Sequence, residues 1–62
     1  MIKAVIIDDE RPSIETLKWK LENYCPEVQV EASFDSPAEG VDYLKKNEPD
    51  LLFLDIEMPG VG

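Results

Sequence analysis

The chain contains two short, uninterrupted apolar runs, and each of them ends abruptly in acidic residues. Residues 4–7 (AVII) are followed by Asp8, and residues 51–54 (LLFL) are followed by Asp55. A continuous apolar run of this length is typical of a strand that is covered on both faces in a parallel sheet. We therefore predict strands over about residues 2–7 and 51–54.

A third segment has a different pattern, because apolar and polar positions alternate along it. Val28, Val30 and Ala32 are separated by single polar residues. An alternation with period two indicates a strand with one face toward the core and one toward solvent. We therefore predict that residues 28–32 form a strand at an edge of the sheet.

Two segments between these predicted strands have the spacing of amphipathic helices. In the first, apolar residues recur three or four positions apart: Ile14, Leu17, Leu21 and Tyr24. In the second, they recur three positions apart: Ala38, Val41 and Leu44. Spacings of three and four place side chains on one face of a helix.

Prolines and polar residues set the expected ends of both helices. The first helix should span Pro12–Tyr24, since proline suits a first turn and Pro26 prevents continuation. The second should span Pro37–Lys46, because Ser36 and Glu39 have the spacing of a capping box. Each predicted helix therefore connects two predicted strands.

The order of these elements is strand, helix, strand, helix, strand, which predicts an α/β fold with a parallel sheet and right-handed crossovers. The carboxyl ends of parallel strands meet at one edge of the sheet, where ligands bind in open α/β folds. Asp8 and Asp9 follow the first strand, and Asp55 follows the third. We therefore expect these three carboxylates to meet at one site.

Composition and charge exclude several functions. The 62 residues include six lysine and arginine residues against 14 acidic ones, a net charge of −8, and the basic residues are scattered. Nucleic acids and anionic membrane surfaces are therefore not expected partners. The single cysteine and the absence of histidine exclude an intrachain disulfide, cysteine-based zinc sites and histidine-dependent catalysis.

No segment has the features of a membrane span or a signal peptide. The apolar runs are far shorter than the roughly 18 residues that a membrane span needs. The first residues lead directly into a short apolar run that ends in acids, without a small-residue cleavage site. Because a free thiol also fits a reducing compartment, we expect a cytoplasmic location.

The three carboxylates suit the chemistry of a metal ion and a phosphoryl group. Mg²⁺ prefers octahedral coordination by oxygen and is often held by one or two carboxylates. A carboxylate beside the ion can attack a phosphoryl group, which gives an aspartyl phosphate. Acids after strands are also common as ordinary solvated loop residues. The sequence DDE at 8–10 therefore indicates a functional site only in combination with DIEMPG at 55–60.

These two motifs resemble a known family. Residues 6–10 (IIDDE) and 52–60 (LFLDIEMPG) are similar to the receiver domain of two-component response regulators, and most similar to receivers of LytTR-type transcription regulators. The resemblance implies a flavodoxin-like parallel sheet with strand order 2-1-3-4-5. This chain supplies the first three strands, in the order 2-1-3. We therefore expect residues 1–62 to be a truncated receiver domain without a second domain.

The resemblance also implies roles for individual residues. Asp55 matches the phosphoacceptor, which takes a phosphoryl group from a sensor histidine kinase. Asp9 matches a Mg²⁺ ligand, Asp8 matches its partner that orients a metal-bound water, and Glu57 stands where a backbone carbonyl binds the metal. The expected magnesium site therefore consists of Asp8, Asp9, Asp55 and the carbonyl of Glu57. The expected function is a non-enzymatic receiver that controls transcription in the intact parent protein.

Parts of the family pattern have no counterpart in this chain. These are the serine or threonine after strand 4, the lysine after strand 5 and the switch aromatic, so we expect inefficient phosphotransfer. The strand at 51–54 would also present unpaired backbone groups at a sheet edge, which is a template for association. We therefore expect a homo-oligomer that completes the half-fold through this edge.

Two other functions remain open at this stage. The half-fold could act as a self-associating structural module, isolated or engineered, that keeps the acidic site only as an inherited feature. Residues 54–57 (LDIE) also faintly resemble the nucleophile of aspartate-based phosphatases, and the acids together faintly resemble metal-dependent nucleic-acid enzymes. Either enzyme would need a lysine or a further acidic motif that this chain lacks.

Overall fold

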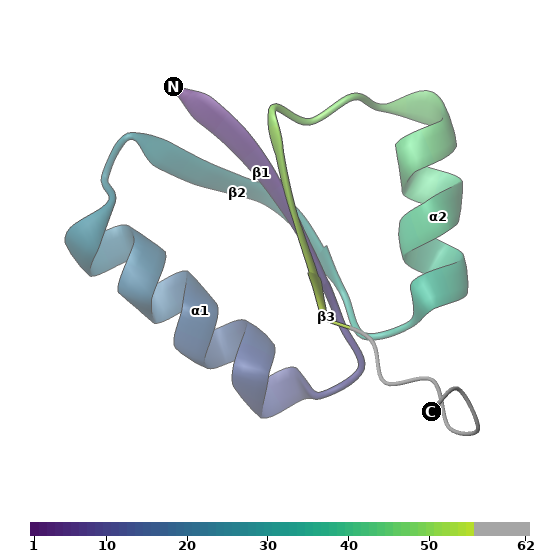
Figure 1. Ribbon diagram of the computed structural model, residues 1–62, viewed down its shortest axis with the longest axis horizontal. Helices are drawn as coiled ribbons and strands as arrows, with labels where there is room; N and C mark the ends of the chain where they lie inside the picture. The colour runs from purple at the N-terminus through teal and green to yellow at the C-terminus, as the bar shows by residue number, and fades with distance from the viewer. Residues whose placement is uncertain (56–62) are drawn as a thin grey trace.

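A computed structural model describes residues 1–55, and these residues form one three-stranded sheet with two helices (Figure 1). The elements in chain order are β1 (Ile2–Asp8), α1 (Arg11–Tyr24), β2 (Val28–Phe34), α2 (Pro37–Lys46) and β3 (Leu51–Asp55). All strand pairs are parallel, and the sheet order is β2-β1-β3. The predicted elements and strand order are therefore confirmed. The loop predicted after β3 lies outside the described residues.

The central strand β1 is covered on both faces, which explains its continuous apolar sequence. The four residues from Ala4 to Ile7 are at most 1% exposed. Neighbouring residues of a strand point to opposite faces, so Ile6 and Ile7 face different helices. Ile6 packs in a cluster with α1, and Ile7 lies against α2. Figure 1 shows the two helices on opposite sides of the sheet.

The apolar stripe of α1 packs against one face of β1. Ile14 and Leu21 are buried and pack with Ile6, and Leu17 joins the cluster from the same helix. Tyr24, which was predicted on this stripe, is instead 72% exposed. Its ring lies in the last turn of α1 and packs edge-on against Trp19, with 6.0 Å between the ring centroids.

The contact of α2 with the sheet depends on a glycine that the stripe did not include. Gly40 is the buried residue of this helix, whereas Val41 is 49% exposed. A Cβ atom at position 40 would lie 2.7 Å from Cγ1 of Ile7, so only glycine allows this approach without a shift. The predicted apolar face of α2 is therefore only partly correct.

The capping box predicted at the start of α2 is not formed. Ser36 occupies the N-cap position, but its side chain makes no capping hydrogen bond. Its backbone carbonyl accepts a hydrogen bond from the Gly40 N–H, at 3.1 Å. Pro37 occupies the first turn and has no N–H, so fewer donors there need a partner.

Tyr43 connects α2 to the outer strand β2. Its ring lies 5.3 Å from that of Phe34, measured between centroids. Partial burial raises the pKa of the Tyr43 phenol, and the nearby Glu31 carboxylate raises it further. No pattern in the sequence indicated this contact.

Strand β3 is an exposed edge of the sheet in the part of the chain that the structure describes. It pairs with β1, and only Phe53 packs against the core cluster. The other apolar side chains of β3 are 37–59% exposed: Leu51, Leu52 and Leu54. The expected edge is therefore present.

Neither described helix is long and apolar enough to cross a membrane.

Candidate acidic site at the carboxyl end of the sheet

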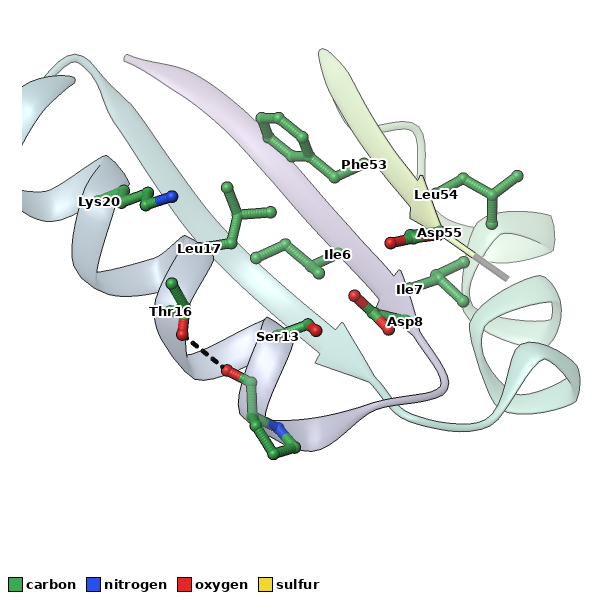
Figure 2. Close-up of a pocket in the computed structure, with 11 residues that line it drawn as sticks. Ile6, Ile7, Asp8, Ser13, Thr16, Leu17, Lys20, Phe53, Leu54 and Asp55 are labelled. Atoms are coloured by element: carbon green, nitrogen blue, oxygen red, sulfur yellow. Dashed lines mark hydrogen bonds between the residues drawn. The ribbon is translucent and has the colours of Figure 1, made fainter. Parts of the chain in front are cut away.

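The parallel pairing of β1 with β3 places Asp8 directly opposite Asp55. Both residues end their strands, and paired residues of neighbouring strands point to the same face of a sheet. Figure 2 shows the two carboxylates close together at one end of a groove. The expectation that these strand ends meet is therefore confirmed for Asp8 and Asp55.

The carboxylate of Asp8 is held in a fixed position by the backbone that follows it. The N–H of Glu10 donates a hydrogen bond to Oδ1 of Asp8, at 2.9 Å. This is the local turn that aspartate forms with a residue two positions on. Asp8 is 7% exposed, which is low for an acidic residue. The turn therefore holds one ordered carboxylate at the carboxyl end of β1, just before α1 begins.

Asp55 lies at the rim of a groove between α1 and the edge strand. The groove has a volume of about 480 Å³ and is lined by both acids and by apolar side chains such as Leu17 and Phe53. Asp55 itself is exposed, so its carboxylate is accessible from solvent. Figure 2 shows Lys20 at the other end of this groove, away from the two acids.

Of the other two members of the predicted magnesium site, Asp9 is not brought together with Asp8 and Asp55. Asp9 is exposed and does not line the groove. Within residues 1–55, no three side chains of the metal-binding types lie close enough together to hold an ion. Glu57 lies outside the described residues. The four-residue magnesium site therefore stays a prediction.

An ion pair that was not predicted from the sequence lies near the carboxyl end of the sheet. Nε of Arg11, the first residue of α1, lies 3.2 Å from Oδ2 of Asp35, which follows β2. It connects the start of α1 to the carboxyl end of β2. Both side chains are substantially exposed, and no local pattern links the two positions. Only the fold brings them together.

Comparison with known proteins agrees with this arrangement. A family model of the response regulator receiver domain matches residues 4–62, and the chain therefore belongs to this family. The strand order and the connections make it the N-terminal part of the flavodoxin-like receiver fold. No solved structure matches the chain significantly.

Individual relatives include transcription regulators. Transcriptional regulatory protein BtsR of Escherichia coli strain K12 is 36% identical over 62 residues, which is 100% of this chain and 26% of BtsR. Sensory transduction protein LytT of Bacillus anthracis is 36% identical over 58 residues, 94% of this chain and 23% of LytT. The predicted resemblance to response regulators of the LytTR type is therefore confirmed.

One relative has the name of an enzyme. Protein-glutamate methylesterase/protein-glutamine glutaminase 1 of Oleidesulfovibrio alaskensis is 39% identical over 59 residues, 95% of this chain and 16% of that protein. The chain spans about a quarter or less of the length of these relatives. That this chain is not itself an enzyme stays a prediction.

Proposed function

We propose that this chain is the phosphoacceptor part of a two-component receiver, with Asp55 as the residue that takes the phosphoryl group. The observation that supports this most directly is the register that sets Asp55 beside Asp8 at the carboxyl edge. In a member of the receiver family, these two strand-end carboxylates supply a nucleophile for acyl phosphate formation and a second acid beside it.

The proposed reaction is the transfer of a phosphoryl group from a phosphohistidine of a sensor kinase. A carboxylate oxygen of Asp55 attacks the phosphorus atom and forms the new P–O bond. The P–N bond breaks, and its electron pair stays with the imidazole nitrogen. Asp55 is exposed and lines the groove, which supports access of a phosphoryl donor from solvent.

Asp8 and Asp55 supply carboxylate oxygens at this edge, and such oxygens are the ligands that Mg²⁺ prefers. We propose that Asp8, Asp9, Asp55 and the backbone carbonyl of Glu57 hold it. Bound there, the ion would neutralise negative charge on the phosphoryl oxygens. The hydrogen bond from Glu10 keeps the Asp8 carboxylate in place before any ligand arrives.

The change Asp55→Asn tests the phosphoacceptor. The chain would be incubated with acetyl phosphate and Mg²⁺, and the gain of one phosphoryl group followed by intact mass. We expect slow labelling of the unchanged chain and none of Asp55→Asn. Asp42→Asn is the matched control, because Asp42 is an exposed carboxylate on α2 and pairs only with Lys45, at 4.0 Å, within residues 1–55. Labelling of Asp55→Asn at the original rate would contradict the proposal.

For the parent protein, we propose that this receiver acts in the cytoplasm and controls a transcription-regulating output. The relatives BtsR and LytT, which bear the names of regulatory and signalling proteins, support this. The chain's net charge of −8 agrees with a segment that does not itself bind nucleic acid.

A second candidate function is self-association through β3. The exposed edge supports it, because Leu52 and Leu54 are 41% and 59% exposed. Two copies that pair along β3 would satisfy free backbone groups and cover these side chains. In this reading the chain is a structural module, and the acidic site has no role in assembly.

The molar mass in solution, measured by light scattering behind a sizing column, tests this second candidate. We expect a dimer that Leu54→Lys converts to a monomer. Val41→Lys is the control, since Val41 is 49% exposed and its helix α2 does not pack against β3. Asp55→Asn should leave the mass unchanged. A monomeric and well-ordered unchanged chain would rule out self-association.

A further inference from the structure

Two hydrogen bonds between Asp50 and Lys3 attach the start of β3 to β1. The backbone N–H of Asp50 donates to the carbonyl of Lys3, at 2.8 Å. In return, the Lys3 N–H donates to Oδ2 of Asp50, at 2.9 Å. Asp50 directly precedes β3, and Lys3 is the second residue of β1. The Asp50 carboxylate thus takes the place of a backbone acceptor where the sheet pairing begins.

The same register continues without a break to the acidic site. Cα pairing runs from Ala4 opposite Leu51 to Asp8 opposite Asp55. A slip of one residue would move Asp55 along β1 by about 3.3 Å and turn its side chain to the other face. The two carboxylates would then no longer face the same groove.

Few other features of the described residues fix this register. A register is weakly specified where neither face of a strand is well buried, and most β3 side chains are exposed. Phe53 supplies the one apolar side chain of β3 that packs with the core cluster. A side-chain hydrogen bond at one end of β3 therefore contributes more to fixing the register than it would in a buried strand.

We infer that Asp50 is a positioning residue for the acidic site, because its carboxylate fixes the register that sets Asp55 beside Asp8. This inference rests on the proposed function of Asp55. Asp50 is five residues from Asp55, about 16 Å along the strand. That separation exceeds the screening length of about 8 Å at physiological salt, so the charge of Asp50 acts little on the site directly.

Three variants of the 62-residue chain separate geometry from charge. Asp50→Ala removes the acceptor and the charge. Asp50→Asn removes the charge but keeps an oxygen that can accept the Lys3 N–H. Glu48→Ala is the matched control, because Glu48 is an exposed acid in the same connection and makes no side-chain hydrogen bond within residues 1–55.

Nuclear magnetic resonance gives two measurements of register that need no metal. The first is the exchange protection of the Lys3 amide, and the second is the cross-strand contact between the backbones of Asp8 and Asp55. In Asp50→Ala we expect the protection to fall about three- to tenfold, the range for one lost hydrogen bond, and the contact to weaken. Asp50→Asn should restore both, and Glu48→Ala should change neither.

A Mg²⁺ titration, followed by the amide signals around Asp8, then connects the register to the site. We expect affinity to fall about threefold or more in Asp50→Ala and to recover in Asp50→Asn, parallel to the register measurements. If Asp50→Ala is folded with unchanged exchange, contact and affinity, the inference is wrong. It is also wrong if Asp50→Asn behaves like Asp50→Ala.

Two outcomes need separate treatment. If the unchanged chain binds no Mg²⁺, the proposed function fails, and the role of Asp50 is judged on the two register measurements alone. If Asp50→Ala unfolds the chain, Asp50→Glu takes its place, because it keeps the charge but moves the acceptor by one methylene group. In Asp50→Glu, native register without protection of the Lys3 amide would overturn the inference. Loss of protection together with a shifted register, or retention of both protection and native register, would support it.

Discussion

Gly40 of α2 packs directly against the side chain of Ile7 in β1, because glycine has no side chain of its own to hold the helix farther from the sheet. This contact brings α2 to the face of β1 opposite α1. It thereby completes the burial of the strand that ends in Asp8.

We predict that Gly40→Ala destabilises the chain. The added methyl group would overlap Ile7, and overpacking of this kind costs about 1–3 kcal/mol. That cost is equal to or greater than the roughly 1 kcal/mol by which alanine favours a helix interior over glycine, so we expect a net loss of up to about 2 kcal/mol. Urea unfolding, followed by the fluorescence of the single tryptophan, measures the change.

The partner of this contact provides the control. Ile7→Val removes the Cδ1 methyl group that the new alanine would meet. Gly40→Ala should therefore cost less in the Ile7→Val background than in the unchanged chain. Equal costs in both backgrounds would show that the overlap with Ile7 is not the cause.

Removal of divalent cations should lower the stability of the fold. A ligand that binds only the folded state at 100 times its dissociation constant adds about 2.7 kcal/mol to the free energy of unfolding. We expect Mg²⁺ to raise the unfolding midpoint and EDTA to reverse the effect. Asp8→Asn should lose most of the gain, and Asp42→Asn should keep it. Sodium chloride at matched ionic strength controls for screening, and a midpoint that responds equally to both salts would contradict a specific site.

The stability of the chain should depend on Tyr43 at alkaline pH. The pKa of this phenol is raised in the folded state, by partial burial and then by Glu31. Above the unfolded value of about 10, the unfolded chain loses the Tyr43 proton first. Its contribution is therefore complete below pH 10 and is lost as the pH rises through the folded pKa. Comparison of Tyr43→Phe with the unchanged chain, by urea midpoints between pH 8 and pH 11, isolates this effect.

Glu31→Gln gives a second check on the same phenol. It removes one of the causes that raise the pKa of Tyr43 but leaves its partial burial unchanged. The alkaline loss of stability should then be smaller than in the unchanged chain and larger than in Tyr43→Phe. If Tyr43→Phe retains the full alkaline dependence, other groups are responsible for it.

The ion pair between Arg11 and Asp35 should contribute little to stability. Both side chains are exposed, and pairs of this kind contribute about 0.2–1 kcal/mol. We expect a double-mutant cycle of Arg11→Ala and Asp35→Ala to give a coupling energy in this range at low salt. The coupling should fall toward zero at 1 M salt, where the screening length is about 3 Å. A larger, salt-independent coupling would mean that the pair does more than connect α1 to β2.

Local patterns predicted the elements of this fold well, because helices and strands depend on residues close in sequence. The stripe containing Ile14 and Leu21 and the apolar run of β1 both lie where they were predicted. Patterns failed where the outcome depends on distant residues. The contact of Gly40 with Ile7 and that of Tyr43 with Phe34 each join segments that share no local signal.

The acidic site, too, was predicted in part, and the parts that were not predicted are specific contacts. The topology alone brings Asp8 beside Asp55, because parallel strands end at one edge. The sequence did not indicate that Glu10 donates to the Asp8 carboxylate or that Asp50 fixes the start of β3. The contact of Asp50 joins positions 47 residues apart, and no local pattern links it to Lys3. Asp9 shows the limit of the inference, since adjacency to Asp8 in the chain did not bring it to the groove.

The central place of β1 has a consequence for the order of folding. This strand comes first in the chain, yet one of its two neighbours is the last described strand. The pairing of Lys3 with Asp50 closes a much longer loop than the pairing of β1 with β2, and longer loops close at a greater entropic cost. We therefore expect β1, α1 and β2 to assemble first and β3 to dock afterwards. Asp8 and Asp55 then become neighbours only in the final step. In a refolding experiment, the binding of a cation between them would therefore mark the completion of the sheet.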